Sequence, residues 1–108
     1  MKNSKLQIVF CTCKNNQEAK KLANALLKAK LVACVNIINN ITSIYIWNKK
    51  LEQSKEVLMI IKTSSVNFLK VERIIKKLHS YEVPEILALE SKKVNKEYLN
   101  WIYTVLKK

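Results

Sequence analysis

The chain contains no glycine, and this absence excludes two common ligand-binding motifs. A phosphate-binding P-loop and a dinucleotide-binding turn both need residues without a Cβ atom where backbone amides approach the ligand. Neither motif is therefore present in these 108 residues. Any nucleotide would have to bind in a different way.

Long apolar runs and targeting segments are also absent from the sequence. No run reaches the roughly 20 apolar residues that span a bilayer. The first residues, MKNSKLQIVF, show neither the apolar region and cleavage site of a signal peptide nor the Arg-rich pattern of a transit peptide. The length of 108 residues corresponds to about one domain. We therefore predict a single domain over 1–108, located in the cytosol and without a membrane partner.

Arginine is nearly absent, although the formal net charge is +12. Clustered cations attract nucleic-acid phosphates, but phosphates and base edges are usually recognised by the planar fork of arginine. Here Arg73 is the only arginine, and the lysines are spread along the whole chain beside many Asn and Ile. A coding bias toward A and T would produce the same pattern, so we expect no nucleic-acid partner.

Three cysteines, Cys11, Cys13 and Cys34, are an odd number that cannot all pair within one chain. Without a secretion signal they are better interpreted as free thiols than as a disulfide framework. Reduced thiols can bind soft metals such as Cu(I) or Zn(II), but cysteine is also an ordinary small core residue. We predict that Cys34, inside the apolar stretch LVACVNI, is a core residue.

Apolar residues recur with strand or helix spacing along the chain and predict the order of elements. The first half of the chain predicts a strand over 6–12, a helix from an Asn15 cap to about Lys30, and one bent strand or two strands over 31–47. The second half predicts a strand within 51–63, a helix capped by Ser64 or Ser65, a strand over 86–89 and a terminal helix from Asn95. The inward face of this last helix is predicted to be Tyr98, Leu99, Ile102 and Leu106. Asn39 and Asn40 mark the predicted kink, and Asn48 replaces glycine in a tight turn because it tolerates a left-handed backbone. The order βαββαβ followed by a last helix is the α+β plan called ferredoxin-like.

Two helices can cover only one face of such a sheet. The remaining apolar surface is more than two short helices can hide, and it includes the strand EVLMII together with Val35, Ile37, Ile44, Ile46 and Trp47. An uncovered apolar sheet face and long exposed edges favour association. We therefore predict a homo-oligomer with these five side chains at its interface.

Four blocks of the sequence resemble one known family. They are LVACVNI at 31–37, SIYIWNKKLEQSKEVLMIIKT at 43–63, HSYEVPEI at 79–86 and YLNWI at 98–102. In this order and spacing they resemble the CutA divalent-cation tolerance proteins, and the resemblance covers about residues 6–103. It implies a ferredoxin-like homotrimer similar in arrangement to PII-like signalling proteins. It also implies a link to tolerance of copper and other divalent cations, with binding of Cu(II), and no defined enzymatic reaction.

The sequence departs from the family pattern at several positions. Ser80 replaces the first proline of the usual HPYEVPE, which predicts a looser loop after the second helix. Asn48 replaces the hairpin glycine, and the glycine usual before the terminal helix is missing. Some members carry two adjacent histidines before that proline, whereas Leu78 precedes His79 here. A metal site built on a histidine pair therefore cannot be transferred intact.

Candidate metal ligands follow from the resemblance and from residue chemistry. Cys11 matches a strand-end cysteine implicated in some family members, and His79 with Glu82 as an oxygen ligand completes the predicted site. Cys11 and Cys13 would point to the same face of a strand about 7 Å apart, so both could bind one soft ion only if the strand end bends. A lone Cys-x-Cys is a weak motif. Adventitious capture of Cu(II) is the competing interpretation.

Catalysis is the weaker interpretation of HSYEVPEI. Glu82, Glu85 and His79 resemble an acid/base group, but no nucleophile or oxyanion loop accompanies them, and we predict that the chain is not an enzyme. An acylphosphatase-type enzyme would need an arginine in an anion-binding loop, and Arg73 falls within the second predicted helix. An RNA-binding module would need exposed aromatic residues on its central strands. Only Phe10 occurs there.

A small-molecule sensor is the remaining alternative. A trimer similar to PII-like signalling proteins would have three equivalent clefts between subunits, and each could bind an effector and pass a signal to a partner protein. The residues expected to line this effector cleft are Trp47, Lys62, Tyr81 and Glu82.

Overall fold

A four-stranded antiparallel sheet, in the spatial order β2-β3-β1-β4, forms the centre of the computed structural model, which describes residues 5–106. The elements are β1 (Leu6–Cys13), α1 (Asn16–Lys28), β2 (Val32–Trp47), β3 (Lys50–Ser64), the 3-10 turn η1 (Ser65–Asn67), α2 (Phe68–Leu78), β4 (Leu87–Glu90) and α3 (Lys96–Val105). This order and topology confirm the predicted ferredoxin-like α+β fold. Within the described residues, no helix is long and apolar enough to span a membrane.

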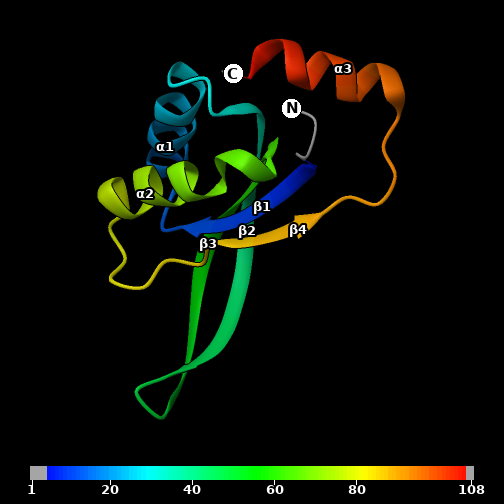
Figure 1. Ribbon diagram of the computed structural model, residues 1–108. Coiled ribbons are helices and arrows are strands. Elements are labelled where there is room, and N and C mark those ends of the chain that lie inside the picture. Colours follow the sequence, from blue (N-terminus) through cyan, green and yellow to red (C-terminus); the bar gives the residue numbers. More distant parts are fainter. Residues whose placement is uncertain (1–4, 107–108) are drawn as a thin grey trace.

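The core lies between the sheet and the two helices α1 and α2, which pack side by side (Figure 1). Alternate residues of a strand point to opposite faces, so every second residue of β1 and β3 faces these helices. The buried residues of this core cluster are Val9, Cys11, Cys13, Ala19, Leu22, Ala23, Leu26, Leu31, Val32, Val57, Met59, Ile61, Val71 and Ile75. The amphipathic spacing of the sequence therefore predicts this layer correctly.

The opposite face of the sheet is only partly covered in the single chain. We call it the open face and define it by Ile8, Phe10, Leu58, Ile60, Leu87 and Leu89, which alternate with core residues or pair with one another across strands. Helix α3 lies apart from α1 and α2 (Figure 1) and covers only one end of the sheet, through Ile102 and Leu106 against Leu6 and Ala33. On β4, Leu87 and Leu89 remain 54% and 53% exposed.

Strand β2 is one long bent strand, which is one of the two alternatives that the sequence left open. The register with β3 shifts between Ile38 and Ile41, and Asn40 has a left-handed φ of 63° at this point. Beyond the bend, β2 and β3 continue as a hairpin that projects from the sheet (Figure 1). Its turn has φ values of 51° at Asn48 and 66° at Lys49, which is the pattern of a type I′ turn. The prediction that Asn48 adopts a left-handed backbone is confirmed.

The start of α2 differs from the prediction. Neither Ser64 nor Ser65 caps this helix, because the 3-10 turn comes first and α2 begins at Phe68. The Ser65 hydroxyl instead accepts a hydrogen bond from the Lys5 amide at 2.9 Å. Asn67 makes no side-chain cap and donates to the Leu31 carbonyl at 3.2 Å. A tertiary hydrogen bond therefore takes the Ser65 hydroxyl, whereas the buried Ser64 hydroxyl has no hydrogen-bond partner among the described residues.

Two further expectations are corrected by the burial pattern. Tyr98 does not face inward, since it is 38% exposed and stacks on Trp101 at a ring separation of 5.9 Å. Cys34 is not a core residue, because it is only half-buried and pairs with Lys62 on the side of the sheet away from α1 and α2. Val35 and Ile37, expected at the oligomer interface, contact the core of their own chain but stay partly exposed, so their place at the interface stays a prediction. The apolar side chains left uncovered on the sheet are those of the open face and of the projecting hairpin.

The hairpin turn provides a test of the missing glycine. Replacing Lys49 by glycine should raise the free energy of unfolding by about 1 kcal/mol, because a left-handed backbone strains a residue with a Cβ atom. Denaturant unfolding of both proteins at one concentration measures this difference. Lys50→Gly is the matched control, since Lys50 begins β3 and glycine in a strand should destabilise. A destabilised Lys49→Gly variant would contradict the assigned turn.

Candidate functional site

Two cysteines and the only histidine meet beneath α1 and α2. Strand β1 extends one residue beyond the predicted end, so that Cys11 and Cys13 both point to the helix side of the sheet. His79 is the C-cap residue of α2. The two thiol sulfurs and one imidazole nitrogen lie within 4.8 Å of one another. The cysteines are fully buried, and His79 is 9% exposed.

A fourth soft donor lies beside these three residues. Met59 on β3 is the register partner of Cys11, and its sulfur is 3.4 Å from the Cys13 sulfur. We call Cys11, Cys13, Met59 and His79 the sulfur–histidine cluster. No local pattern pointed to Met59, because only the pairing of β1 with β3 brings it to this position.

Both ring nitrogens of His79 already have hydrogen-bond partners. Its Nε2 lies 2.8 Å from the Thr12 carbonyl oxygen, and since a carbonyl can only accept, Nε2 carries the proton. Its Nδ1 accepts a hydrogen bond from the Tyr81 amide at 3.0 Å. A metal ion could therefore take an imidazole nitrogen only in exchange for one of these two bonds.

The Cys11 thiol is protonated in the absence of an ion. The hydrogen bond with Cys13 and then burial raise the pKa of the Cys11 thiol far above its usual range. Metals bind the thiolate, so an ion entering the cluster must displace a proton. Metal affinity at this site should accordingly increase with pH.

Glu18 links the start of α1 to the loop after α2. Its two carboxylate oxygens accept hydrogen bonds from the Lys14 amide at 3.2 Å and the Ser80 amide at 2.9 Å. Burial acts to raise the pKa of Glu18, but hydrogen bonds from Ser80 and Lys14 outweigh it and the net shift is downward. A proline at position 80 could not donate this bond. Ser80 therefore anchors the loop, contrary to the looser loop predicted from the sequence.

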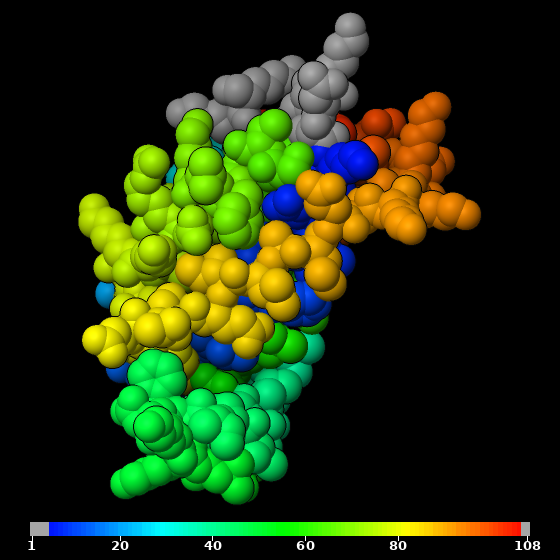
Figure 2. Space-filling view, turned by 60° about the horizontal axis from the view of Figure 1, so that its bottom comes forward, coloured from blue at the N-terminus to red at the C-terminus, as the bar shows by residue number. Residues whose placement is uncertain are grey.

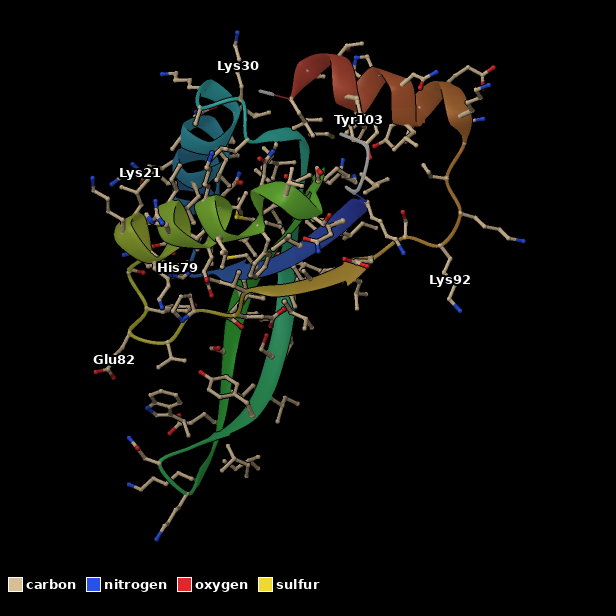
Figure 3. All side chains as sticks on the ribbon, viewed as in Figure 1. Lys21, Lys30, His79, Glu82, Lys92 and Tyr103 are labelled. Carbon is tan, nitrogen blue, oxygen red and sulfur yellow. The ribbon has the colours of Figure 1, made fainter. Side chains whose placement is uncertain are left out.

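Glu82 does not belong to the cluster. It is exposed, and Figure 3 shows its carboxylate pointing outward from the loop, away from His79. The predicted set of Cys11, His79 and Glu82 is therefore corrected to Cys11, Cys13 and His79. The sequence left open whether the thiols of Cys11 and Cys13 could reach one ion at the end of β1. In the structure both thiols belong to the same group.

A cleft of about 570 Å³ lies between the projecting hairpin and the loop after α2. Figure 2 shows this loop (yellow) next to the hairpin (green). We call it the hairpin–loop cleft, and it is lined by Thr12, Ser43, Ile44, Tyr45, Trp47, Glu56, Tyr81, Glu82, Val83 and Glu85. Three of the four residues expected to line an effector cleft are thus brought together. Lys62 is not among them.

Tyr81 joins this cleft to the sulfur–histidine cluster. Its hydroxyl donates to a carboxylate oxygen of Glu56 at 2.7 Å, and its ring lies 4.7 Å from that of His79. Burial and the neighbouring Glu56 raise the pKa of the Tyr81 hydroxyl, so Tyr81 is a neutral donor at physiological pH. The same loop therefore contributes one residue to each site.

The fold and the site can now be compared with known proteins. The family model described as "CutA1 divalent ion tolerance protein" matches residues 7–105. The chain belongs to this family. "Protein CutA" of Mus musculus is 44% identical over 96 residues, which are 89% of this chain and 54% of that protein. "Divalent-cation tolerance protein CutA" of Thermus thermophilus is 40% identical over 96 residues, or 89% of this chain and 93% of that protein.

Solved CutA structures have the same fold. The divalent cation tolerance protein from Thermus thermophilus matches with a TM-score of 0.92 and 37% identity over 94% of this chain and 99% of that chain. CutA1 from Oryza sativa matches with a TM-score of 0.93 and 36% identity over 96% and 95%. These matches confirm the predicted CutA resemblance and its α+β fold. The chain spans about half the length of the mammalian CutA relatives that it matches.

The donor set of the cluster fits a metal ion of the soft or borderline kind. Thiolate and imidazole are the ligands that zinc and copper prefer, and carboxylate-rich sites suit Mg²⁺ or Ca²⁺ instead. Cys11, Cys13 and His79 are a thiol pair and an imidazole without a carboxylate. Among the described residues, theirs is the only group of three or more such side chains with ligand atoms this close together.

Glu18→Gln should lower the free energy of unfolding at neutral pH by about 2 kcal/mol, because a charged acceptor of two amide hydrogen bonds becomes neutral. The lowered pKa of Glu18 means that its contribution is present above the unfolded value of about 4.5 and is lost as the pH falls through the folded value. The difference between wild type and variant should therefore shrink in acid. Denaturant unfolding near pH 7 and near pH 3 measures it.

The matched control for this pH series is Glu52→Gln, at an exposed position of the projecting hairpin. It should change stability by less than about 0.5 kcal/mol at both pH values. If the difference for Glu18→Gln stayed constant with pH, the charge of Glu18 would have no role in the anchoring of the loop.

Proposed function

We propose that this chain acts in divalent-cation tolerance by binding a metal ion at Cys11, Cys13 and His79, with copper as the first candidate. The observation that carries the proposal is the convergence of two buried thiols and one imidazole within 4.8 Å in a protein of this family. Clusters of this kind bind metals when the thiols lose their protons. The family description names divalent ions. Copper is the first candidate because the CutA resemblance implies it, and thiolate and imidazole donors suit copper as well as zinc.

A binding role is better supported than a catalytic one. Glu82 and Glu85 are exposed at the loop surface, and both nitrogens of His79 are engaged in hydrogen bonds. A general base needs a free nitrogen within reach of a substrate proton. The hairpin–loop cleft has the size of a small-molecule site, but the alternative of a PII-like sensor gains no support from the CutA relatives.

The uncovered apolar surface supports assembly into a homotrimer. The open face carries six large apolar side chains, and the hairpin adds Ile44, Ile46 and Trp47, which are 64%, 68% and 45% exposed. An uncovered apolar surface on this scale is characteristic of interfaces. Three copies related by a threefold axis would cover this surface and bring neighbouring hairpins together. Val35 and Ile37 are partly exposed in the single chain and remain proposed interface residues.

A reducing compartment such as the cytosol fits the three cysteines, which are all free thiols. Disulfides are rare in such compartments because glutathione and thioredoxin keep thiols reduced. The same reduced state keeps Cys11 and Cys13 available to a metal ion. We therefore keep the cytosol as the proposed location.

Calorimetric titration of the full chain with Zn(II), Ni(II) and Cu(II) tests the proposed function. Cys11→Ser and His79→Ala should each weaken binding by about tenfold or more, because each removes one ligand. Glu82→Gln and Cys34→Ser are the matched controls and should leave the affinity unchanged, since neither residue lies in the cluster. Unchanged affinity in Cys11→Ser and His79→Ala would remove the metal site.

Sedimentation equilibrium tests the proposed trimer. The wild-type chain should have three times the 12.6 kDa mass of one copy at micromolar concentration. Ile60→Lys places a charge on the open face and should yield a smaller species, because burying an unpaired charge is very unfavourable. Leu69→Lys is the control, since Leu69 is 70% exposed on α2 and away from that face. A stable wild-type monomer would refute the assembly.

A further inference from the structure

We propose that the sulfur–histidine cluster selects monovalent copper, Cu(I), over divalent ions, and that Cys13 and Met59 provide this preference. The inference rests on the proposed function, because it concerns the ion that the same site binds. It assigns Met59 as a fourth ligand. The cluster would then distinguish the oxidation state of copper as well as the element.

The first support is the softness of the donors. Met59 and Cys13 are in direct contact, with their sulfur atoms 3.4 Å apart, and the Cys11 sulfur and a His79 nitrogen complete the set. Thiolate and thioether sulfurs are soft ligands of the kind that select Cu(I). Zinc uses thiolate and imidazole but takes thioether sulfur rarely. The contact with Met59 therefore favours Cu(I) over Zn(II).

The second support is that the nearby oxygen atoms are already in use. The Glu18 carboxylate accepts hydrogen bonds from the amides of Lys14 and Ser80, and the Thr12 carbonyl accepts one from His79. Glu82 is exposed on the loop. Hard divalent ions need several oxygen ligands or retained waters, and a fully buried sulfur pocket supplies neither. Cu(I) needs no oxygen ligand.

The third support is that the three sulfur atoms are held in place before any ion binds. Cys11 and Met59 are opposite each other on paired strands, and Cys13 is two residues further along β1 on the same face. All three side chains are fully buried, so their rotamers are fixed by packing. His79 has to give up one hydrogen bond, and the thiols of Cys13 and Cys11 lose those to Met59 and to the Thr12 carbonyl together with their protons. Prearranged ligands reduce the ordering that binding would otherwise require.

The test is an anaerobic competition between the full chain and a chromophoric Cu(I) chelator, with a parallel Zn(II) titration. Met59→Leu should weaken Cu(I) binding by about tenfold or more and leave Zn(II) affinity within about twofold. Cys13→Ser should weaken the binding of both Cu(I) and Zn(II), since a thiolate is a ligand for both ions. Methionine and leucine have similar volumes, so the Met59→Leu protein should fold. Cys34→Ser, on the other side of the sheet, is the control.

X-ray absorption of the copper-loaded chain gives a second readout that does not depend on affinity. The wild type should show a shell made mainly of sulfur, and Met59→Leu should show one sulfur fewer. Two results would overturn the assignment of Met59 as a ligand. In the first, Met59→Leu binds Cu(I) as tightly as the wild type, and in the second, Met59→Leu loses as much affinity for Zn(II) as for Cu(I). A wild-type chain that prefers Zn(II) to Cu(I) would overturn the selectivity.

These outcomes separate the inference from the function on which it rests. One outcome is that Cys11→Ser and His79→Ala weaken the binding of Zn(II) and Ni(II), while the wild-type chain does not remove Cu(I) from the chelator. In that case the proposed selectivity for Cu(I) is wrong and the metal-binding function is still supported. If no ion binds in a manner that depends on Cys11 or His79, both fail.

Discussion

The antiparallel register between β1 and β3 is the constraint on which the rest of the molecule depends. It places Cys11 opposite Met59 and Phe10 opposite Ile60, so it determines the composition of both faces of the sheet. Because side chains alternate, a slip of one residue would move the sulfur atoms to the open face and the bulky apolar residues into the core. The core, the sulfur–histidine cluster and the proposed interface therefore have one common structural cause.

Local patterns in the sequence were enough to predict most of the fold. The helical spacing after Asn15 and the apolar run that contains Met59 predicted α1 and β3, and Asn48 predicted the turn between β2 and β3. The start of α2 was missed because Asn67 and Ser65 bond to distant backbone groups, which spacing along the chain cannot show. Tyr98 was misplaced because the side chains that pack under α3 depend on which part of the sheet it crosses.

The candidate site was only partly predictable for the same reason. Cys11 and His79 were recognised through family resemblance and residue chemistry, whereas Met59 has no local signal and enters the cluster only through strand pairing. Glu82 was chosen because it is near His79 in sequence, and the loop turns its carboxylate to solvent. Ser80 was interpreted as a loss of rigidity because a proline is replaced, but its amide gains a hydrogen bond to a buried carboxylate. Closeness in the sequence therefore did not predict which of these side chains lie close together in the structure.

The shared loop also limits what a single substitution can reveal. His79 holds the Tyr81 amide with one ring nitrogen, and the Tyr81 hydroxyl holds Glu56 in the cleft. A change at His79 therefore disturbs the support of the cleft together with the metal ligand set. The hydrogen bond of the Cys11 thiol to the cleft lining goes to its chain neighbour Thr12, and Cys11 supports no residue of the loop by a hydrogen bond among the described residues. An effect shared by Cys11→Ser and His79→Ala belongs to the cluster, whereas an effect of His79→Ala alone belongs to the loop that the two sites share.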